Sequence, residues 1–372
     1  MRQIGILLLC CISLLSSGAQ TVPNLYRAVD QEKMNHWVDS VFDAMSYDER
    51  IGQLFMVIAN PKSDNRNMQR LMRYVNDIKI GGILFHKGDP VTQAEVTNRL
   101  QKASRIPMLV SLDGEWGLSM RLSGTTRFPK NMMLGAIEDN ALIEEYGKEV
   151  GRQCREMGIH INFAPDMDVN SNVDNPVIGL RSFGENPEAV SEKGIAYARG
   201  LENTGILSVS KHFPGHGDTD VDSHKALPIL PFTRERLDSV ELYPFKEAIR
   251  AGVGGMMVGH LQVPVIEPIG GLPSSLSRNV VYDLLTDELA FKGLIFTDAF
   301  AMAVVTDLLQ KELGFQGLCF TDALAMKGAS TKKTDNPSVK ALLAGNDILL
   351  APAAPINDFK AVKEAIEEGV LD

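Results

Sequence analysis

Short apolar runs alternate with longer amphipathic stretches along most of this 372-residue chain. The runs cover residues 51–59, 82–85, 107–112, 159–164, 206–210, 255–258, 293–296, 317–320 and 348–351. Between them, apolar positions recur every three or four residues, which is the spacing of one helix face, as in residues 141–157, 187–202, 233–251 and 358–368. Strands that alternate with helices predict βαβ units and a parallel sheet.

Polar residues follow most of the predicted strands: Asp113, Asp166, Lys211, His212, His260, Asp298 and Asp322. In a (β/α)8 barrel, functional residues gather at the carboxyl ends of the strands. A doubly wound open sheet is the alternative, but it would need a glycine-rich phosphate turn after its first strand, and residues 60–63 read Asn-Pro-Lys-Ser. We therefore predict an α/β fold, a (β/α)8 TIM barrel.

Residues 280–302 and 304–326 match at most positions, so one helix–strand unit is duplicated in tandem. The chain thus carries nine strand signals. Because a closed barrel has a fixed strand number and stagger, a ninth strand should not fit without cost. We expect eight barrel positions, with one copy extruded or poorly fitted.

The formal net charge of −10 argues against a nucleic-acid or anionic-membrane partner, because either needs a clustered basic face. Residues 1–19 combine Arg2, an apolar run over 4–15 and small residues before Gln20, which predicts a secretory signal peptide. The apolar run is too short to span a bilayer. We expect a secreted protein, in the periplasm. Without that peptide, Cys154 and Cys319 remain, too few for a disulfide framework.

The segment KHFPGHGDTDVDSH, residues 211–224, holds three histidines and three aspartates just beyond the strand predicted over 206–210. Its glycines and Pro214 are typical of a loop held over a site. Asp222 and His224 lie two residues apart, so the carboxylate can orient the imidazole, which suits proton donation and then abstraction. A metal site formed by His212, His216, Asp222 and His224 is a second interpretation, but no helical His-Glu-x-x-His spacing accompanies these residues. A lone histidine such as His260 is more simply a satisfied core group.

These motifs resemble glycoside hydrolase family three, specifically its single-domain bacterial β-N-acetylglucosaminidases. The most specific match is KHFPGHG at 211–217 followed by Asp222-Ser223-His224. Supporting matches are SLDGE at 111–115, NFAP at 162–165, GLRSF at 179–183, PSSLS at 273–277 and the Thr-Asp-Ala-x-Ala-Met end of each duplicated strand. The resemblance runs from about Asp48 to the C-terminus.

The resemblance implies roles for individual residues. The N-acetylglucosamine ring would be held by Asp113, Arg121, Arg181, Lys211 and His212. Asp222 and His224 would form the dyad in which histidine acts as general acid and then base. The nucleophile would be the aspartate of the Thr-Asp-Ala-x-Ala-Met motif, as expected of a retaining glycosidase with a glycosyl-enzyme intermediate. No cofactor or metal is implied.

The duplication leaves two candidate nucleophiles, Asp298 and Asp322. We prefer Asp322, because its Asp-Ala-Leu-Ala-Met context is closer to the family pattern and it leads directly toward the last predicted strand. Trp116 and Leu118 depart from that pattern, where a glycine and an arginine are usual, so details of the substrate site are expected to differ.

The expected organisation is a signal peptide at 1–19, a lead-in at 20–47 and a barrel domain at 48–372 that is truncated at its C-terminal end. In the family that the chain resembles, β-glucosidases usually take their acid from a second domain, which we do not expect here, so the Asp222–His224 dyad favours N-acetylhexosaminides such as muropeptides over glucosides. Two alternatives remain: a β-glucosidase or β-xylosidase of the same fold, and a catalytically silent sugar-binding barrel.

Overall fold

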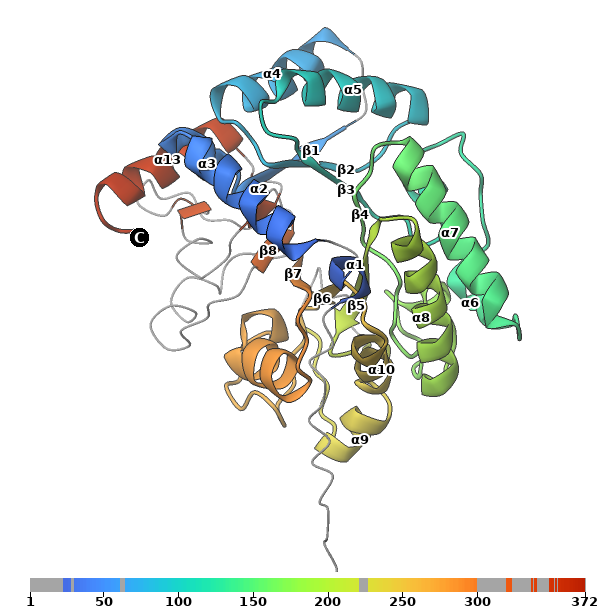
Figure 1. Ribbon diagram of the computed structural model, residues 1–372. Coiled ribbons are helices and arrows are strands. Elements are labelled where there is room, and N and C mark those ends of the chain that lie inside the picture. The colour runs from blue at the N-terminus through green and yellow to red at the C-terminus, as the bar shows by residue number, and fades with distance from the viewer. Residues whose placement is uncertain are drawn as a thin grey trace, which may run out of the picture.

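The computed structural model describes residues 23–27, 30–60, 64–220, 227–299, 319–322, 336, 338–339, 348–350, 352 and 354–371. Within this part of the chain, parallel strands pair in sequence order and the last pairs with the first, so that the sheet closes into a barrel (Figure 1). The strands are β1 (Phe55–Ala59), β2 (Gly82–Phe85), β3 (Leu109–Leu112), β4 (Ile161–Asn162), β5 (Leu207–Phe213), β6 (Gly255–Val258), β7 (Leu294–Ala299), β8 (Cys319–Asp322) and β9 (Ile348–Leu350). The α/β class and the parallel sheet predicted from the sequence are confirmed.

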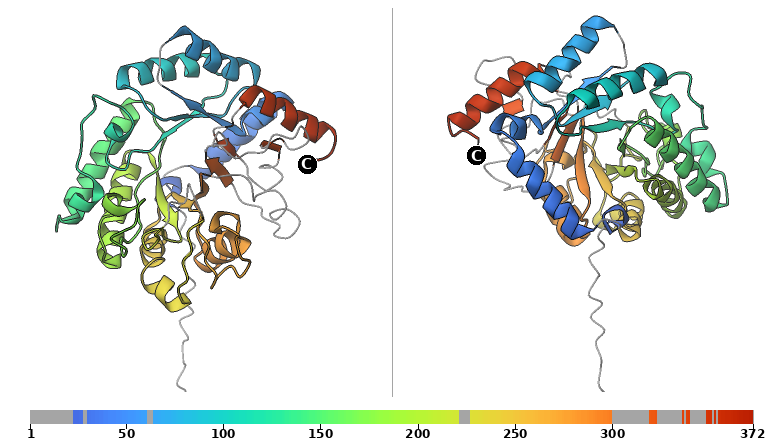
Figure 2. Two further views of the ribbon diagram at one scale, coloured as in Figure 1. Left: turned by 180° about the vertical axis from the view of Figure 1, so that it is seen from behind. Right: turned by 45° about the horizontal axis from the view of Figure 1, so that its top comes forward.

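Helices surround the strands, as the view from behind also shows (Figure 2). The α-helices are α1 (Asn24–Arg27), α2 (Gln31–Ala44), α3 (Tyr47–Gly52), α4 (Asn65–Asp77), α5 (Pro90–Ala103), α6 (Asn131–Gly135), α7 (Asn140–Glu156), α8 (Pro187–Asn203), α9 (Arg234–Ser239), α10 (Tyr243–Ala251) and α13 (Pro355–Glu367). A further helical segment covers Asn279–Glu288, and single turns cover Leu118–Met120, Gly179–Arg181 and Ser274–Leu276. Several helices begin at a side-chain cap; Asp89, for example, accepts from the Thr92 amide before α5.

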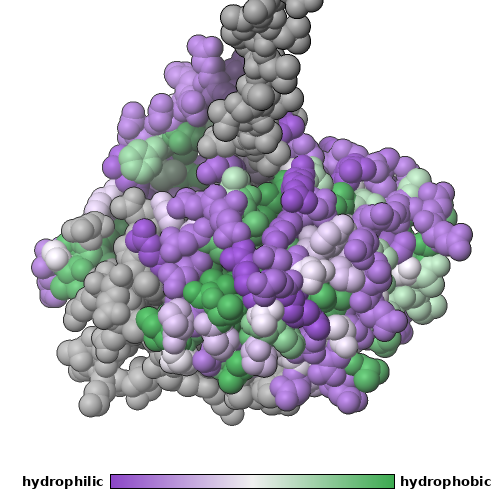
Figure 3. Space-filling view, turned by 90° about the horizontal axis from the view of Figure 1, so that it is seen from below, coloured by the Kyte–Doolittle hydropathy of each residue, from purple (hydrophilic) through white to green (hydrophobic). Residues whose placement is uncertain are grey.

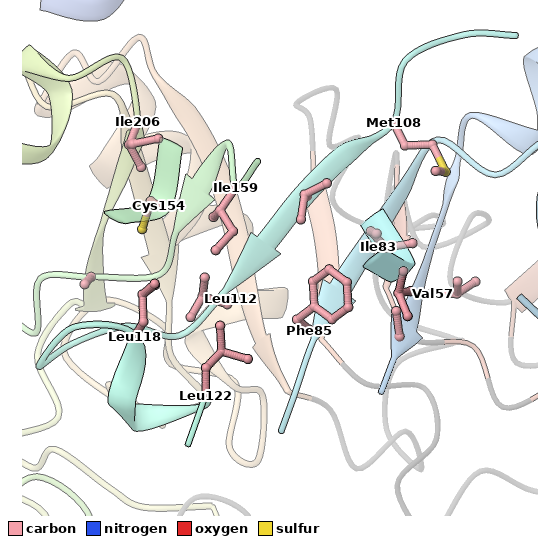
Figure 4. Close-up of a cluster of buried hydrophobic side chains, with 14 of the residues drawn as sticks. Val57, Ile83, Phe85, Met108, Leu112, Leu118, Leu122, Cys154, Ile159 and Ile206 are labelled. Atoms are coloured by element: carbon pink, nitrogen blue, oxygen red, sulfur yellow. The ribbon is translucent and has the colours of Figure 1, made fainter. Parts of the chain in front are cut away.

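Both faces of the strands are apolar, because helices cover the outer face and the barrel closes over the inner one. In β1, Val57 packs into the outer cluster, between the strands and the helices, whereas Met56 belongs to the inner cluster. Figure 4 shows part of the outer cluster, where Ile83 and Phe85 from β2 lie near Val57. Successive residues of a strand point to opposite faces, so this alternation fixes which residues enter the barrel.

The barrel interior is filled by apolar side chains from most of the strands. These are Met56, Leu84, Ile161, Phe163, Leu207, Val209, Met257 and Phe296. Phe163 and Phe296 meet edge to face with ring centroids 5.4 Å apart. The interior is therefore a packed core, and a ligand site on this fold has to lie above it.

The duplicated strands depart from expectation. Both copies enter the ring: β8 pairs with β7 on one side and with β9 on the other, which gives nine strands in the described part of the chain. The expectation of eight barrel positions was therefore wrong. The two copies share the sequence Phe-Thr-Asp-Ala, so each offers the same short apolar strand to its neighbours. The pairing of β7 with β8 contains a register shift, because Phe320 lies opposite Phe296 but Asp322 lies opposite Ala299.

Three element bounds also differ from the sequence prediction. The helix expected over 233–251 is interrupted between Ser239 and Tyr243, so that α9 and α10 are separate. Strand β5 continues through Phe213, three residues into the segment predicted as a loop. The polar lead-in contains α2, whose Trp37 and Phe42 are exposed on one side and line an apolar cavity of about 390 Å³ with Leu109 of β3.

The outer surface agrees with the composition. Hydrophilic residues dominate the face seen from below, with hydrophobic residues in small groups between them (Figure 3). Such scattered apolar groups are ordinary on a folded protein. Among the described residues, no helix combines the length and hydrophobicity that crossing a bilayer requires.

Candidate active site

The strand alternation places charged residues directly above the apolar interior. In β5, Leu207 and Val209 point into the barrel, so Lys211 does as well. In β3, the Ser111 hydroxyl lies 3.6 Å from the sulfur of interior Met56, and Asp113 follows two residues later. Both Asp113 and Lys211 therefore face the axis at the carboxyl end of the barrel.

These rim residues form a partly buried ion network. The Lys211 Nζ lies 3.1 Å from Asp113 Oδ1 and 2.8 Å from Glu115 Oε1, and Arg121 pairs with the other oxygen of Asp113. Burial acts to raise the pKa of Asp113, but the charges of Lys211 and Arg121 outweigh it and hold that pKa below its ordinary value. Burial would lower the pKa of Lys211, yet Glu115 and Asp113 keep it raised. Asp113 and Lys211 are therefore both charged at neutral pH.

Arg181 joins this network to the next strand. It is the last residue of the turn at Gly179–Arg181, and its backbone carbonyl accepts a 2.7 Å hydrogen bond from Asn131 Nδ2. Its guanidinium donates two hydrogen bonds, of 2.9 and 2.7 Å, to the fully buried carboxylate of Glu115. Nη2 also lies 3.3 Å from His212 Nε2. This bidentate pairing fixes the plane of the guanidinium beside His212.

His212 is oriented from its other side by Asp168. Its Nδ1 lies 2.7 Å from Asp168 Oδ2, and Asp168 also accepts the backbone amide of His216 at 2.6 Å. A proton on Nδ1 satisfies Asp168 and leaves Nε2 as the acceptor facing Arg181. Burial acts to raise the pKa of Asp168, and the neighbouring His212 more than offsets this, so the carboxyl stays ionised.

The five predicted sugar-binding residues, Asp113, Arg121, Arg181, Lys211 and His212, thus come together at one end of the barrel, within a single set of contacts. Sequence reasoning did not assign roles to three carboxylates that hold them: Glu115, Asp166 and Asp168. The available signal was their position, since Glu115 lies two residues after Asp113, and Asp166 and Asp168 follow strand β4.

Asp166 is the least satisfied member of the cluster. Its Oδ1 accepts from the Asp168 amide at 3.0 Å, while Oδ2 is buried without a hydrogen-bond partner among the described residues and lies 3.6 Å from Arg181 Nε. Burial and the adjacent negative charge of Asp168 raise the pKa of Asp166 well above its ordinary value. The pair therefore holds one ionised and one more readily protonated carboxyl.

Asp166, Asp168 and His212 also have ligand atoms within 4.8 Å of one another, a spacing that a metal ion could bridge. Arg181 already brings a positive charge to Asp166, and its Nη2 approaches His212. A cation at that place would face electrostatic repulsion from the guanidinium. Of the residues considered for a metal site from the sequence, His216 instead has its Nδ1 2.7 Å from the hydroxyl of Thr219.

The proposed catalytic residues are only partly described. Asp222 and His224 fall in 221–226, outside the described residues. Asp298 lies buried in β7. The backbone of Asp322 ends β8, and its side chain lies outside the described part. His260 is buried with its Nδ1 2.6 Å from the Ser275 hydroxyl, which agrees with a structural role.

A parallel barrel with a cluster of carboxylates and cations above its core defines a class of enzymes that bind polar, hydroxyl-rich substrates at the strand ends. The chain belongs to glycosyl hydrolase family 3, because the sequence model of that family's N-terminal domain matches residues 46–307 and 303–372. The two matches overlap within the duplicated region.

Known proteins of this family show what the chain is similar to. A β-hexosaminidase A from Pseudoalteromonas piscicida is 36% identical over 256 residues, covering 63% of this chain and 43% of the relative. The solved family 3 β-N-acetylglucosaminidase from Paenibacillus is 34% identical with a TM-score of 0.71, covering 88% of this chain and 60% of that protein. The β-N-acetylhexosaminidase from Beutenbergia cavernae is 26% identical with a TM-score of 0.67, covering 88% and 93%. This chain thus spans less than half of the first relative.

Proposed function

We propose that the chain is a retaining β-N-acetylhexosaminidase that removes terminal, non-reducing N-acetylglucosamine from cell-wall or related glycans. The observation that carries this proposal is the partly buried cluster formed by Asp113, Arg181, Lys211 and His212 at the mouth of the barrel. Fixed carboxylate acceptors beside fixed cationic donors match the alternating hydroxyls of a sugar ring. Relatives named β-hexosaminidase support the choice of sugar.

The proposed reaction has two steps. A carboxylate oxygen of the nucleophilic aspartate bonds to C1 of the sugar while the bond from C1 to the leaving oxygen breaks, and His224, backed by Asp222, gives that oxygen its proton. The same imidazole then takes a proton from water as the water oxygen bonds to C1 and releases the carboxylate. Two displacements at C1 return the β configuration.

Residues 1–19 support a periplasmic location, because they have the form of a secretory signal peptide. Cell-wall fragments containing N-acetylglucosamine are the substrates such a location would supply. The proposal needs no membrane span and no nucleic-acid partner.

A β-glucosidase is the second candidate. One relative, from Cellulomonas fimi, is 30% identical over 275 residues and is named for both activities, β-N-acetylglucosaminidase/β-glucosidase. The two sugars differ only at C2, where an acetamido group replaces a hydroxyl. A site that contacts this group should discriminate clearly between them.

The test compares hydrolysis of aryl β-N-acetylglucosaminide and aryl β-glucoside, with the first product anomer followed by NMR. We expect the N-acetylglucosaminide to have the larger kcat/KM and the β anomer to appear first. A larger kcat/KM for the glucoside would make the glucosidase reading correct. Binding of N-acetylglucosamine without hydrolysis of either substrate would indicate a silent barrel, and loss of activity to a chelator would indicate a metal-dependent hydrolase.

A further inference from the structure

The tandem duplication gives this chain two copies of the strand that carries the proposed nucleophile, and the copies occupy different places in the ring. We infer that Asp298, in the first copy, is the nucleophile and that Asp322 is a duplicate without a role in the reaction. This inference rests on the proposed function and reverses the preference drawn from sequence context alone.

The side chain of Asp298 points toward the barrel axis. Phe296 lies in the apolar interior of the barrel and meets Phe163 there. Asp298 is two residues further along β7, so it points to the same face at the carboxyl end of the strand. The relation between Phe296 and Asp298 is the one that Val209 has to Lys211 in β5. Asp298 therefore faces the axis on which the charged cluster lies.

Strand order and pairing also bring Asp298 near the charged cluster. Phe213 of β5 pairs with Val258 of β6, and Val258 pairs with Thr297 of β7, so Asp298 begins just above the level at which β5 ends. The segment that follows β5 carries His216. The residues of the charged cluster lie at or after the carboxyl ends of β3, β4 and β5, and β6 lies between β5 and β7.

The charge of Asp298 also acts on a residue beside the cluster. Burial and the nearby His212 lower the pKa of His216, and the negative charges of Asp168 and, to a smaller extent, Asp298 act in the opposite direction. His216 in turn donates its backbone amide to Asp168, the residue that orients His212. The direction of Asp298 and its level on the barrel axis carry the inference, and the effect of its charge on His216 agrees with them.

The second copy of the strand has a different position in the ring. Strand β8 lies one position further around the ring from β5, next to β9. A register shift in the pairing of β7 with β8 sets Asp322 opposite Ala299 rather than opposite Asp298. The backbone of the second copy is therefore displaced by one residue along β7 as well as by one strand around the barrel.

The experiment labels the wild-type protein and compares two matched variants. A 5-fluoro-N-acetylglucosaminyl fluoride should react with the nucleophile, because fluoride leaves readily and the ring fluorine slows release of the glycosyl-enzyme. Peptide mass spectrometry then identifies the labelled aspartate. We expect the label on Asp298. In parallel, Asp298→Asn should lower kcat/KM by about 10⁴-fold or more, as removal of a covalent catalyst does, whereas Asp322→Asn should leave it within about threefold of wild type.

Rescue by azide separates a chemical role from a folding defect. Azide added to Asp298→Gly should restore release of the aryl group and yield the α-glycosyl azide, because azide attacks C1 once from the face that the carboxylate left. A label on Asp322, or azide rescue of Asp322→Gly only, would overturn the inference and leave the proposed function intact. Hydrolysis that survives both asparagine substitutions would also overturn it. A wild-type protein that neither hydrolyses the aryl substrate nor takes the label would instead overturn the proposed function.

Discussion

The inward face of strand β5 divides into two halves with opposite chemistry. Leu207 and Val209 contribute to the apolar interior, while Lys211, the next residue on the same face, makes ion pairs with Asp113 and Glu115. Strand β7 repeats the division with Phe296 and Asp298. One backbone pattern thus builds the core of the barrel and, a few ångströms higher, its candidate active site.

The two halves stabilise the fold to different extents. Each apolar side chain removed from water contributes roughly 1.5–3 kcal/mol. The charged half offsets its attractive energy with the cost of taking ions out of water, and a buried ion pair is often no better for stability than apolar residues of the same volume. The charged half is therefore better explained by ligand binding than by stability.

The most severe test of this division is Lys211→Met, which keeps the length of the side chain and removes its charge. Asp113 and Glu115 would lose a shared cation inside the barrel, and breaking a buried pair costs about 3–5 kcal/mol. Thermal and denaturant unfolding should record that loss, and kcat/KM should fall by about 10²–10³-fold. The control is Lys211→Met with Glu115→Gln, which should recover part of the stability but no activity. A stable and active single variant would contradict the assignment.

In the apolar half, Leu207→Ala should lower the free energy of unfolding by about 2–5 kcal/mol, because it leaves a cavity in the interior. Its effect on kcat/KM of the folded protein should be much smaller than that of Lys211→Met, since Leu207 lies two inward positions below the charged cluster. Denaturant unfolding at a temperature where the variant remains folded gives the first value, and initial rates give the second. Equal losses of activity in both variants would show that the two halves are not separable.

The sequence predicted this arrangement where a pattern repeats. The strand and helix order followed from apolar runs, and the convergence of Asp113, Lys211 and His212 followed from their positions after strands. The contacts of Glu115 and Asp168 could not be predicted, because partner choice among several carboxylates depends on side-chain geometry. The same holds for the extension of β5 through Phe213, where pairing with β6 decides between strand and loop.

The duplicated strands show a second feature that the sequence could not predict, their places in the ring. The fixed strand number of a closed barrel predicts eight positions, with one copy extruded or poorly fitted, whereas pairing places both β7 and β8 inside the ring. Near-identical sequences give identical local preferences, so the sequence alone cannot say how the ring accommodates them. The register shift at Ala299 is a property of the assembled sheet.

A smaller effect is expected one contact away from the substrate. Asp168→Asn keeps the shape of the side chain but removes the charge that fixes the His212 tautomer. By analogy with other residues that orient a ligand-binding histidine, kcat/KM should fall by about 10–100-fold. The pH profile of kcat/KM should shift as well, because Asp168 is held ionised beside His212 and an amide cannot carry that charge. A purely structural role would lower the melting temperature and leave the profile in place.

The smallest expected effect concerns Asp166, whose carboxyl lies in the charged half at a cost to the stability of the fold. Its pKa in the folded protein is raised by burial and by Asp168, so the folded state binds its proton more tightly than the unfolded chain does. The stability that this proton contributes is complete below the ordinary pKa near 3.8 and is lost as pH rises through the raised value. Asp166→Asn should therefore be more stable than wild type at neutral pH and should lose less stability as pH increases from 4.

Denaturant unfolding at several pH values measures both, with Asp174→Asn as the control, an exposed aspartate in the same loop. If Asp166→Asn is less stable than wild type at pH 7, the ionised carboxylate contributes more through Arg181 than burial and Asp168 cost, and the charged half is itself a source of stability.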